Sequence, residues 1–393
     1  MAQKIVFFVL GTRPEAIKLA PLISELRKDE ELTVTLCAFR QHGRMLDEAL
    51  AAFDLTPDFD FGIALGDSGL LNPSRNPLKK LFDAARTGWG LLRFFLLLKR
   101  TRPSLLVVHG DTSTAFLAAF FAFHFKILVA HVEAGLRTGN KYAPFPEEMN
   151  RRLVAVLADL HFSPTEAARE NLIREGVSPS KIFVTGNTEL DALRMILEMH
   201  KDPARKAKVE KALAAALGSE AEGKKLILVT AHRRESFGEG LENICAALLA
   251  LAKKRSDILI VYPVHPNPHV RKVVFSRLGN VSGVRLIEAL PYETFAAAMQ
   301  RAYLILTDSG GIQEAVSFLG KPTLVMREFT ERGEGLLAGT TRLVGTDAQK
   351  IVEETERLLD DPAHYERMAR PHASFGDGFA AQKIALEARK YIS

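Results

Sequence analysis

The sequence contains few cysteines, no long apolar run and no strong excess of charge of one sign. Cys37 and Cys245 are its only 2 cysteines in 393 residues, and both lie in apolar runs without a neighbouring cysteine. This pattern excludes a disulfide framework and favours buried thiols in a reducing compartment. The longest apolar stretches, Gly88–Leu98 and Ala115–Phe125, fall short of the roughly 20 residues that a membrane-spanning helix needs. We therefore expect a soluble, cytoplasmic protein.

The net charge is also modest, because 52 Lys and Arg residues oppose 47 Asp and Glu residues and leave a balance of +5. The basic residues are scattered along the chain rather than gathered in one arm, which argues against nucleic acid as a partner. The first apolar run, Ile5–Leu10, ends at Gly11 and is too short for the core of a signal peptide. It predicts a first β-strand instead.

Length and apolar periodicity predict two α/β domains. A single hydrophobic core stops growing at roughly 250 to 300 residues, and short apolar runs alternate with amphipathic segments along this chain, as in βαβ units. We predict Rossmann-like domains with parallel sheets at residues 1–186 and 187–374, facing an interdomain cleft, and a C-terminal helix within 375–393 that folds back on the first domain. The predicted strands are Lys4–Leu10, Thr33–Ala38, Ser104–His109, Lys126–Val132, Leu160–Ser163, Lys181–Thr185, Lys225–Thr230, Ile258–Tyr262, Val284–Ile287, Tyr303–Leu306, Thr323–Met326 and Arg342–Val344, and the clearest helices are Tyr292–Arg301, Asp347–Leu359 and Phe379–Tyr391.

Polar and charged clusters follow several of these predicted strands directly. Open α/β sheets bind ligands beyond the carboxyl ends of their strands, where the strand order reverses. We therefore expect both halves of the chain to contribute to one site, through the segments Gly11–Glu15, His109–Ser113, His131–Gly135, Ala231–Glu235 and Asp308–Gly311.

Two of these segments have the pattern of anion-binding turns. In GTRPEAIKLAPL a glycine turn leads into a helix, with Arg13 and Lys18 close to its start; helix N-terminal amides favour anions, and Arg adds bidentate phosphate contacts. In TDSGGIQEAV, residues Ser309, Gly310 and Gly311 allow backbone amides to approach a diphosphate, with Glu314 placed for a ribose hydroxyl. The alternative for both segments is a plain turn between a strand and a helix.

Four carboxylates are candidate acids and bases: Asp111, Glu133, Glu147 and Glu148. They follow strands or lie in the Gly- and Pro-rich segment 135–152, which we expect to be irregular. A cleft shifts carboxylate pKa values into a range useful for proton transfer. Each carboxylate alone is better explained by a salt bridge, and their clustering is what favours catalysis. The nearest basic partners are Arg137, Arg151 and Arg152.

Histidines supply a further candidate. In AHRRESFGEGLENI, His232 is placed to donate to a phosphate or transfer a proton, and Arg233 and Arg234 are placed to bind phosphate. In the alternative, one arginine pairs with Glu235 or Glu239.

Prolines between His265 and His269 disfavour a metal site there. His109, His131 and His161 lack ligand spacing and are interpreted as satisfied core or rim histidines. We predict no metal.

A basic amphipathic segment at residues 78–102 combines apolar bulk with seven Lys and Arg residues. The pattern fits a helix that touches an anionic membrane or a partner. We favour a helix that covers the sheet or forms a subunit interface, because a buried strand follows at once, and we expect no stable membrane association.

Nine segments in one order along nearly the whole chain together resemble the non-hydrolysing UDP-N-acetylglucosamine 2-epimerases. They are GTRPEAIKLAPL, HGDTST, HVEAGLRTGN, PFPEEMNRR, TGNTELDAL, VTAHRRESFGEGLENI, TDSGGIQEA, GKPTLVMREFTER and AGTTRLVGTD. The resemblance implies a GT-B fold, a homodimer, no cofactor, and interconversion of UDP-GlcNAc with UDP-ManNAc, which supplies ManNAc for surface polysaccharide synthesis.

The resemblance also implies roles for particular residues. Arg13 matches a phosphate-contacting arginine and Lys18 a motif lysine, while the catalytic positions match Asp111, Glu133, Glu147 and His232. The diphosphate-binding turn matches Ser309, Gly310 and Gly311, and the remaining substrate contacts match Phe295, near the uracil, and Arg332.

The chain departs from the family pattern at a few positions. The second glutamate of the DSGG motif, which holds the ribose in the family, is replaced by Ala315, and Gly43 and Arg44 replace an Arg-Glu pair. Residues 66–103 form a segment longer than the family's. Three alternatives stay open: an epimerase for a modified UDP-sugar, a GT-B glycosyltransferase, or a catalytically silent nucleotide-sugar binding protein.

Overall fold

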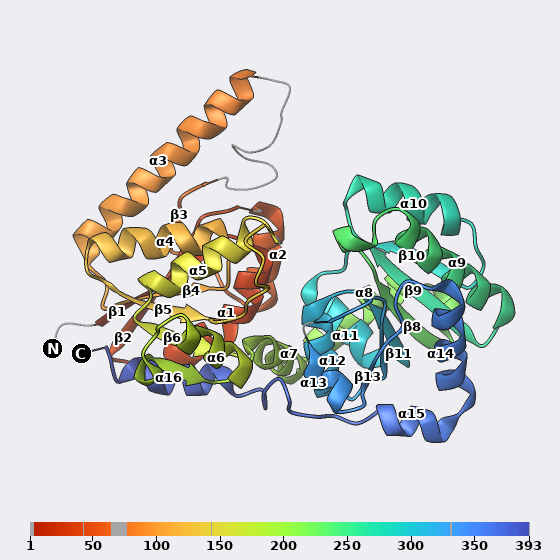
Figure 1. Ribbon diagram of the computed structural model, residues 1–393. Coiled ribbons are helices and arrows are strands. Elements are labelled where there is room, and N and C mark those ends of the chain that lie inside the picture. The colour runs from red at the N-terminus through yellow and green to blue at the C-terminus, as the bar shows by residue number, and fades with distance from the viewer. Residues whose placement is uncertain (1–3, 42, 64–76, 143, 331, 393) are drawn as a thin grey trace. The chain divides into compact units, whose positions relative to one another are not determined.

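The computed structural model describes residues 4–41, 43–63, 77–142, 144–330 and 332–392. The backbone divides into two compact units (Figure 1). Unit 1 consists of Met1–Met195 and Gly378–Ser393, and unit 2 of Ile196–Asp377. Both units are α/β with one parallel sheet each, which confirms the predicted fold class. The limits 1–186 and 187–374 stay predictions for the two functional domains.

Unit 1 contains a seven-stranded sheet in the order β3-β2-β1-β4-β5-β6-β7. Every neighbouring pair is parallel, and β1 is the strand from which the order runs in both directions: Val6 pairs with Val34 of β2 and with Leu105 of β4. The strands are near-continuous apolar runs because helices cover both faces. Their bounds are β1 Lys4–Leu10, β2 Leu32–Ala38, β3 Phe59–Asp60, β4 Leu105–His109, β5 Leu128–Val132, β6 Leu160–Ser163 and β7 Ile182–Val184.

The helices of unit 1 pack in two groups. Helix α1 contacts α2 and α16, so the C-terminal helix lies in unit 1 beside the first helix of the chain, whereas α4 contacts α5 and α3 (Figure 1). Phe7 and Val9 of β1 pack with Phe94 of α3 and Ala118 of α4 in one fully buried cluster. The bounds are α1 Arg13–Leu26, α2 Gly43–Ala52, α3 Pro77–Thr101, α4 Ser113–His124, α5 Glu147–Leu157, α6 Glu166–Arg174, η1 Pro179–Lys181, α7 Thr188–Met199, which runs into unit 2, and α16 Ala380–Arg389.

Unit 2 repeats this topology with a six-stranded parallel sheet in the order β10-β9-β8-β11-β12-β13. Its strands are β8 Lys225–Thr230, β9 Ile258–Val264, β10 Val284–Glu288, β11 Leu304–Thr307, β12 Thr323–Val325 and β13 Thr341–Leu343. Its helices are α8 Pro203–Leu217, η2 Ser219–Ala221, η3 Arg234–Ser236, α9 Glu239–Lys254, α10 Pro268–Leu278, α11 Tyr292–Arg301, α12 Gly310–Leu319, α13 Gly333–Leu337, α14 Ala348–Asp360 and α15 Pro362–Met368. Its core joins Ile260 and Tyr262 of β9 with α9 and α14, and includes the buried thiol of Cys245.

The structure corrects two details of the sequence-based elements. The short edge strand β3 was not predicted, because two residues carry no periodic signal. The segment 135–152, predicted to be irregular, is helical from Glu147 onward. Pro146 immediately precedes this helix, and Glu147 and Glu148 fill its first turn, where negative charge is favourable. The proline that suggested a loop therefore marks a helix start.

The basic segment at 78–102 forms α3, which is 25 residues long. Its C-terminal half covers the sheet as predicted, since Phe94 and Leu98 are fully buried. Its N-terminal half extends away from the sheet of unit 1 (Figure 1), and Phe82 and Trp89 are more than half exposed. Among the described residues, no helix has both the length and the apolar composition needed to cross a membrane.

Candidate active site

The turn between β1 and α1 packs tightly against the start of α4. A Cβ atom on Gly11 would lie 2.1 Å from Oγ1 of Thr114, so only glycine fits at this position. The backbone N–H groups of Gly11 and Thr12 donate to the buried Glu15 carboxylate, at 2.8 and 2.7 Å. These two amides are therefore not available to a ligand anion, which corrects that part of the predicted anion-binding turn. Arg13 follows them and is exposed at the start of α1.

Two buried ion pairs lie at the carboxyl ends of β4 and β5. Lys18 of α1 pairs with Glu133, and both side chains are about one-tenth exposed. Arg151 of α5 pairs with Asp111, whose backbone oxygen also accepts a hydrogen bond from Asn150 Nδ2 at 3.0 Å. The structure thus brings together Lys18, Asp111 and Glu133, three of the predicted site residues.

The backbone at these strand ends is unusual. Glu133 adopts φ 62°, in the left-handed region, and such residues cluster at functional sites because the surrounding structure must hold them there. Gly110, on the neighbouring strand end, has φ 64°, and a Cβ atom there would lie 3.4 Å from Oε2 of Glu133. Backbone strain and a side-chain charge therefore coincide at one point of the sheet edge.

The acids of this cluster have shifted pKa values. Burial raises the pKa of Asp111, while the Arg151 charge opposes the rise. Burial acts in the same direction on Glu133, but the Lys18 ammonium and its neighbours outweigh it and hold the pKa of Glu133 well below its usual range. One carboxylate is thus poised for proton transfer, and the other stays ionised.

His109 completes this cluster, which we call the acid cluster: Lys18, His109, Asp111, Glu133 and Arg151. Its Nε2 lies 3.9 Å from Oε2 of Glu133 and has no hydrogen-bond partner among the described residues. Burial lowers the pKa of His109 to about 4, so the ring is neutral at pH 7. The prediction of a satisfied histidine is therefore wrong for His109.

Glu147, the third predicted catalytic carboxylate, sits in the first turn of α5. Its Oε2 atom is buried and has no hydrogen-bond partner within the part of the chain that the structure describes. A buried, unpaired carboxylate oxygen is costly, so a ligand group that donates to it would be bound favourably.

In unit 2, the buried carboxylate of Asp308 holds the loop after β8. Its Oδ2 accepts from the backbone N–H groups of His232 and Arg233, both at 2.7 Å, and its Oδ1 lies 3.7 Å from Nδ1 of His232. The His232 ring stacks on His265, with centroids 5.0 Å apart and planes at 11°. His232 is about one-third exposed, so an oriented imidazole faces solvent at the end of β8.

Helix α12 starts at Gly310, directly after Ser309. The first N–H groups of a helix have no partner within it and attract anions, and Ser309 makes no side-chain capping bond. A Cβ atom on Gly310 would lie 3.1 Å from the Arg332 guanidinium carbon, whereas Gly311 faces open space. The Ser309 N–H is already used, because it donates to the Thr307 hydroxyl at 3.0 Å. Among the described residues, the first amides of the helix itself, at Gly310 and Gly311, remain for a ligand, with a guanidinium beside them.

The other predicted residues of unit 2 have mixed placements. Glu314 is buried and accepts from Nε of Arg332 at 2.8 Å, so the carboxylate expected at a ribose is already paired. Phe295 is half-buried on α11. Glu235 pairs with Arg327, at 2.5 Å. The side chain of Arg234 lies outside the described residues.

Sequence reasoning missed several residues that build the site. Arg151 was noted only as a general salt-bridge partner, and Glu15 and Asp308 only as letters of their motifs. For Glu15 and Asp308 the sequence does contain a signal, because a carboxylate beside a glycine turn at a strand end is placed to bind the backbone N–H groups of that turn. The remaining missed residues, His109 and His265, carry no spacing signal.

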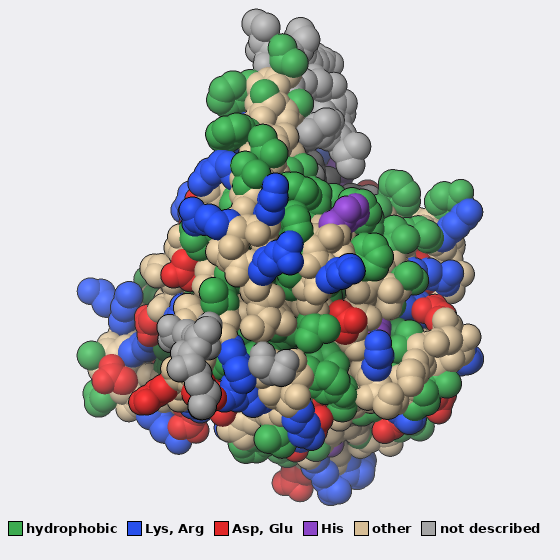
Figure 2. All heavy atoms as spheres, turned by 90° about the vertical axis from the view of Figure 1, so that its left-hand side faces the viewer, with side chains coloured by type: hydrophobic (Ala, Val, Ile, Leu, Met, Phe, Trp, Pro, Cys, Tyr) green, Lys and Arg blue, Asp and Glu red, His purple; other side chains and the backbone are tan. Residues whose placement is uncertain are grey.

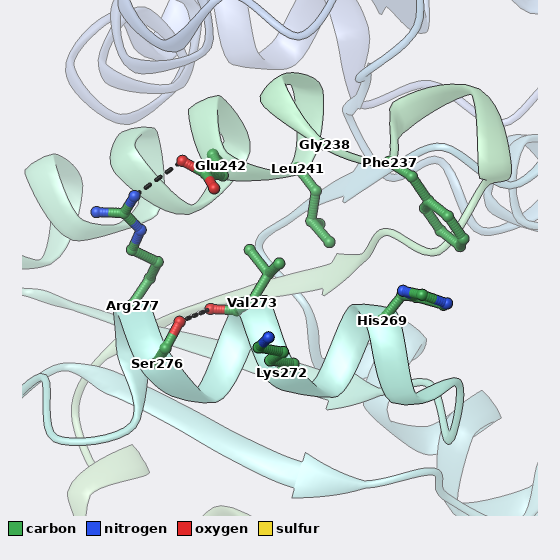
Figure 3. A pocket seen from close by; sticks show the side chains of 9 residues that line it. All are labelled: Phe237, Gly238, Leu241, Glu242, His269, Lys272, Val273, Ser276 and Arg277. Carbon is green, nitrogen blue, oxygen red and sulfur yellow. Dashed lines mark hydrogen bonds and ion pairs between the residues drawn. The ribbon is translucent and has the colours of Figure 1, made fainter.

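A groove of about 600 Å³ lies between α9 and α10 in unit 2 (Figure 3). Leu241 and Val273 line its floor, and Arg277 reaches across to Glu242 at 2.8 Å. No predicted site residue lines this groove. The chemistry-bearing side chains gather elsewhere, at the carboxyl ends of the strands.

Comparison with known proteins gives concordant results. A family model described as UDP-N-acetylglucosamine 2-epimerase matches residues 24–387. The UDP-N-acetylglucosamine 2-epimerase of Escherichia coli strain K12 is 49% identical over 387 residues, covering 98% of each chain. The crystal structure of UDP-GlcNAc 2-epimerase from Neisseria meningitidis bound to UDP-GlcNAc matches with a TM-score of 0.85 and 42% identity, over 98% of this chain and 100% of the other. The Methanocaldococcus jannaschii enzyme in complex with UDP-GlcNAc and UDP matches with a TM-score of 0.79 and 29% identity, over 98% and 99%.

Proposed function

Because the chain belongs to the UDP-N-acetylglucosamine 2-epimerase family, we propose that it interconverts UDP-GlcNAc and UDP-ManNAc. The observation that carries this proposal is the acid cluster at the ends of β4 and β5, where the partly buried Asp111 and Glu133 lie beside Arg151 and Lys18. Inversion of a sugar carbon requires groups that take up and return a proton, and partly buried carboxylates with separated pKa values supply them.

The chemistry favours elimination over direct deprotonation. C2 of the sugar has no neighbouring carbonyl to acidify its proton, so a base removes that proton while the C1–O bond breaks and its electron pair leaves with UDP. The product is 2-acetamidoglucal. UDP then adds back to C1, and the proton is delivered to the opposite face of C2. The reaction is redox-neutral: UDP returns to C1, and one proton, exchangeable with solvent, is added to C2 for the one removed.

In this scheme, unit 1 handles the proton. Asp111, whose pKa burial raises, is assigned the proton exchange, whereas Lys18 keeps Glu133 ionised. Glu147, with its unpaired buried oxygen, is the third acid assigned to the sugar.

Unit 2 handles the diphosphate. Negative charge develops on UDP as it leaves, and fixed donors aimed at this charge lower the barrier. The amides of Gly310 and Gly311, the Ser309 hydroxyl, the Arg332 guanidinium beside Gly310 and the oriented His232 ring form such a donor set. The Ser309 amide is already used by the Thr307 hydroxyl. Arg13 and Arg233 add phosphate contacts, and Phe295 contacts the uracil. Glu314 acts through Arg332, with which it pairs.

One experiment tests the proposed activity directly. Purified protein is incubated with UDP-GlcNAc in deuterated water, and C2 is followed by NMR. We expect deuterium at C2 together with the manno epimer. Glu166→Gln changes an acid at an exposed position on α6. It serves as the matched control for Asp111→Asn and should behave like the wild type. Sugar transfer to an acceptor without C2 exchange, or UDP binding without turnover, would refute the epimerase.

The same proposal includes a homodimer located in the cytoplasm. The dimer is supported by the apolar face of α3 and α4. Figure 2 shows it as hydrophobic side chains gathered over these helices, with Lys and Arg among them. On α3, apolar side chains repeat at alternating intervals of three and four residues, as in a helix-pairing seam. The seam is Phe82, Ala85, Trp89, Leu92 and Leu96, of which the large residues are 45 to 68% exposed.

The oligomeric state is testable by analytical ultracentrifugation. We expect a dimer for the wild type, and a monomer for Trp89→Glu, which places a charge in the middle of the seam. Arg86→Glu, on the same helix but outside the seam, serves as the control for a mere change of charge. A wild-type monomer at micromolar concentration would contradict the dimer.

A further inference from the structure

Each unit contains one buried carboxylate that joins two loops across the point where the strand order reverses. In unit 1 the adjacent strands are β1 and β4, and in unit 2 they are β8 and β11. Glu15 is 1% exposed and Asp308 is fully buried. Neither belongs to the acids and donors assigned above to the substrate.

Glu15 uses both of its carboxylate oxygens. Oε2 accepts from the N–H groups of Gly11 and Thr12 and from the Thr12 hydroxyl, at 2.8, 2.7 and 2.9 Å. Oε1 accepts from the Thr112 hydroxyl at 2.5 Å. The first set of bonds holds the turn that carries Arg13, and the last bond reaches the residue that follows Asp111.

Asp308 has the corresponding arrangement in unit 2. Its Oδ2 binds the backbone N–H groups of His232 and Arg233, so a residue after β11 holds the loop after β8. Its Oδ1 lies 3.7 Å from Nδ1 of the His232 ring, beyond hydrogen-bond distance, and has no hydrogen-bond partner among the described residues. One carboxylate thus holds the loop that carries His232 and places a negative charge beside the ring.

We propose that Glu15 and Asp308 are positioning residues of the epimerase reaction: each fixes the separation of two loops that carry reacting or charge-stabilising groups. The inference rests on the proposed function. Catalytic groups must be held in position to well under 1 Å, because a displacement of about 1 Å can cost about 10²-fold in rate. A single carboxylate that accepts bonds from two loops supplies this restraint without contacting the substrate.

A purely structural role does not account for the choice of residue. Burial raises the pKa of Glu15, so an ionised group at this place is costly to the fold. A shorter capping side chain would satisfy the turn amides alone. Only a side chain with two acceptor oxygens joins the Thr112 hydroxyl to that turn, which is what positioning requires.

The test in unit 1 removes the link while leaving the chain folded. Glu15→Gln keeps the shape but loses one acceptor oxygen, and Thr112→Val loses the hydroxyl. We expect kcat to fall about 10- to 100-fold in each, with KM within about threefold. The double variant should fall no further than the more severe single variant, because both changes break one connection. Thr112→Ser keeps the hydroxyl and should restore kcat.

The test in unit 2 uses Asp308→Asn. The amide oxygen still accepts from the two N–H groups, but the NH2 group then faces Nδ1 of His232 and favours the other ring tautomer. We expect kcat to fall about 100-fold, while the Kd for UDP stays within about threefold. Asp361→Asn, which keeps its capping role at the start of α15, is the matched control and should leave kcat unchanged.

Four outcomes are informative. A wild type without C2 exchange overturns the proposed function itself. If the wild type is active and kcat is unchanged in Glu15→Gln and Asp308→Asn, the positioning roles are overturned but the proposed function is not. Variants that lose only thermal stability, with normal kcat, show that the carboxylates serve the fold. Loss of kcat in folded protein, with rescue by Thr112→Ser, supports the inference.

Discussion

The two units share a sheet topology but end their central strands with different chemistry. In unit 1, the ends of β4 and β5 carry side-chain charges in buried pairs, Asp111 with Arg151 and Glu133 with Lys18. In unit 2, the ends of β8 and β11 carry backbone amides, an oriented His232 and the Arg332 guanidinium. One scaffold thus carries the groups proposed for proton transfer in one copy and those proposed for anion binding in the other.

The first turns of two helices show the physical origin of this difference. At the start of α1, the Glu15 carboxylate binds the N–H groups of Gly11 and Thr12, so an internal anion already occupies that position. At the start of α12, Ser309 makes no capping bond through its side chain, and only its own N–H is used, by the Thr307 hydroxyl. The Gly310 and Gly311 amides are left for the proposed ligand. The same helix start is a structural joint in unit 1 and the proposed binding site in unit 2.

The largest expected effect comes from breaking the acid cluster. Asp111→Asn should lower kcat by about 10³-fold, since a positioned acid or base contributes 10²- to 10⁴-fold. The affinity for UDP should stay within about threefold, because the proposed diphosphate donors of unit 2 are untouched. Steady-state kinetics and calorimetry with UDP measure the two quantities. Equal losses of kcat and UDP affinity would abolish the contrast between the units.

A smaller effect is expected at the anion-binding end. His232→Gln removes a donor to the developing charge and should lower kcat by about 10²-fold. Unlike Asp111→Asn, it should also weaken UDP binding. His269→Gln, on α10 and outside the proposed site, is the control. Normal UDP affinity in His232→Gln would show that His232 does not contact the diphosphate.

The Arg332–Glu314 pair connects the anion site to the stability of unit 2. Arg332→Met leaves the Glu314 carboxylate, 5% exposed, without its guanidinium partner and should destabilise the fold by about 2 kcal/mol. Urea denaturation measures the loss. The double variant Arg332→Met/Glu314→Leu should recover part of it, because no unpaired charge remains. An additive loss in the double variant would show that the two side chains act independently.

The smallest predicted effect concerns acid sensitivity, which is concentrated in unit 1. Burial lowers the pKa of His131 to about 3, from an ordinary value of 6.5. The unfolded chain therefore takes up a proton first as the pH falls, and stability is lost between about pH 6.5 and pH 3. The slope per group is at most about 1.4 kcal/mol per pH unit.

His131→Gln should remove this slope, so the free energies of unfolding of variant and wild type should converge as the pH falls from 7.5 to 5.5. His364→Gln in unit 2 is the matched control, because the pKa of His364 is lowered without so large a shift. Urea denaturation at the two pH values measures both. Parallel pH profiles for wild type and His131→Gln would contradict a neutral buried histidine.

Sequence patterns predicted most of the strands because buried parallel strands are apolar on both faces, and this leaves a readable run of residues. They failed where local signals compete. Pro146 suggested a loop and begins α5 instead, and His109 looked like core packing and lies beside Glu133. Partner choice was also beyond the sequence, since Glu235 pairs with Arg327, which is 92 residues away.

By itself, the sequence determined the α/β class, the positions of most strands, and the rule that chemistry follows their carboxyl ends. These depend on hydrophobic periodicity and turn residues, which are local. Tertiary structure alone decided which charges pair, which amides are occupied by Glu15 or left open at α12, and how burial and the neighbouring positive charges set the pKa values of Asp111 and Glu133 apart. These depend on distances between residues far apart in the chain and on the loss of water around them, and no local pattern encodes either.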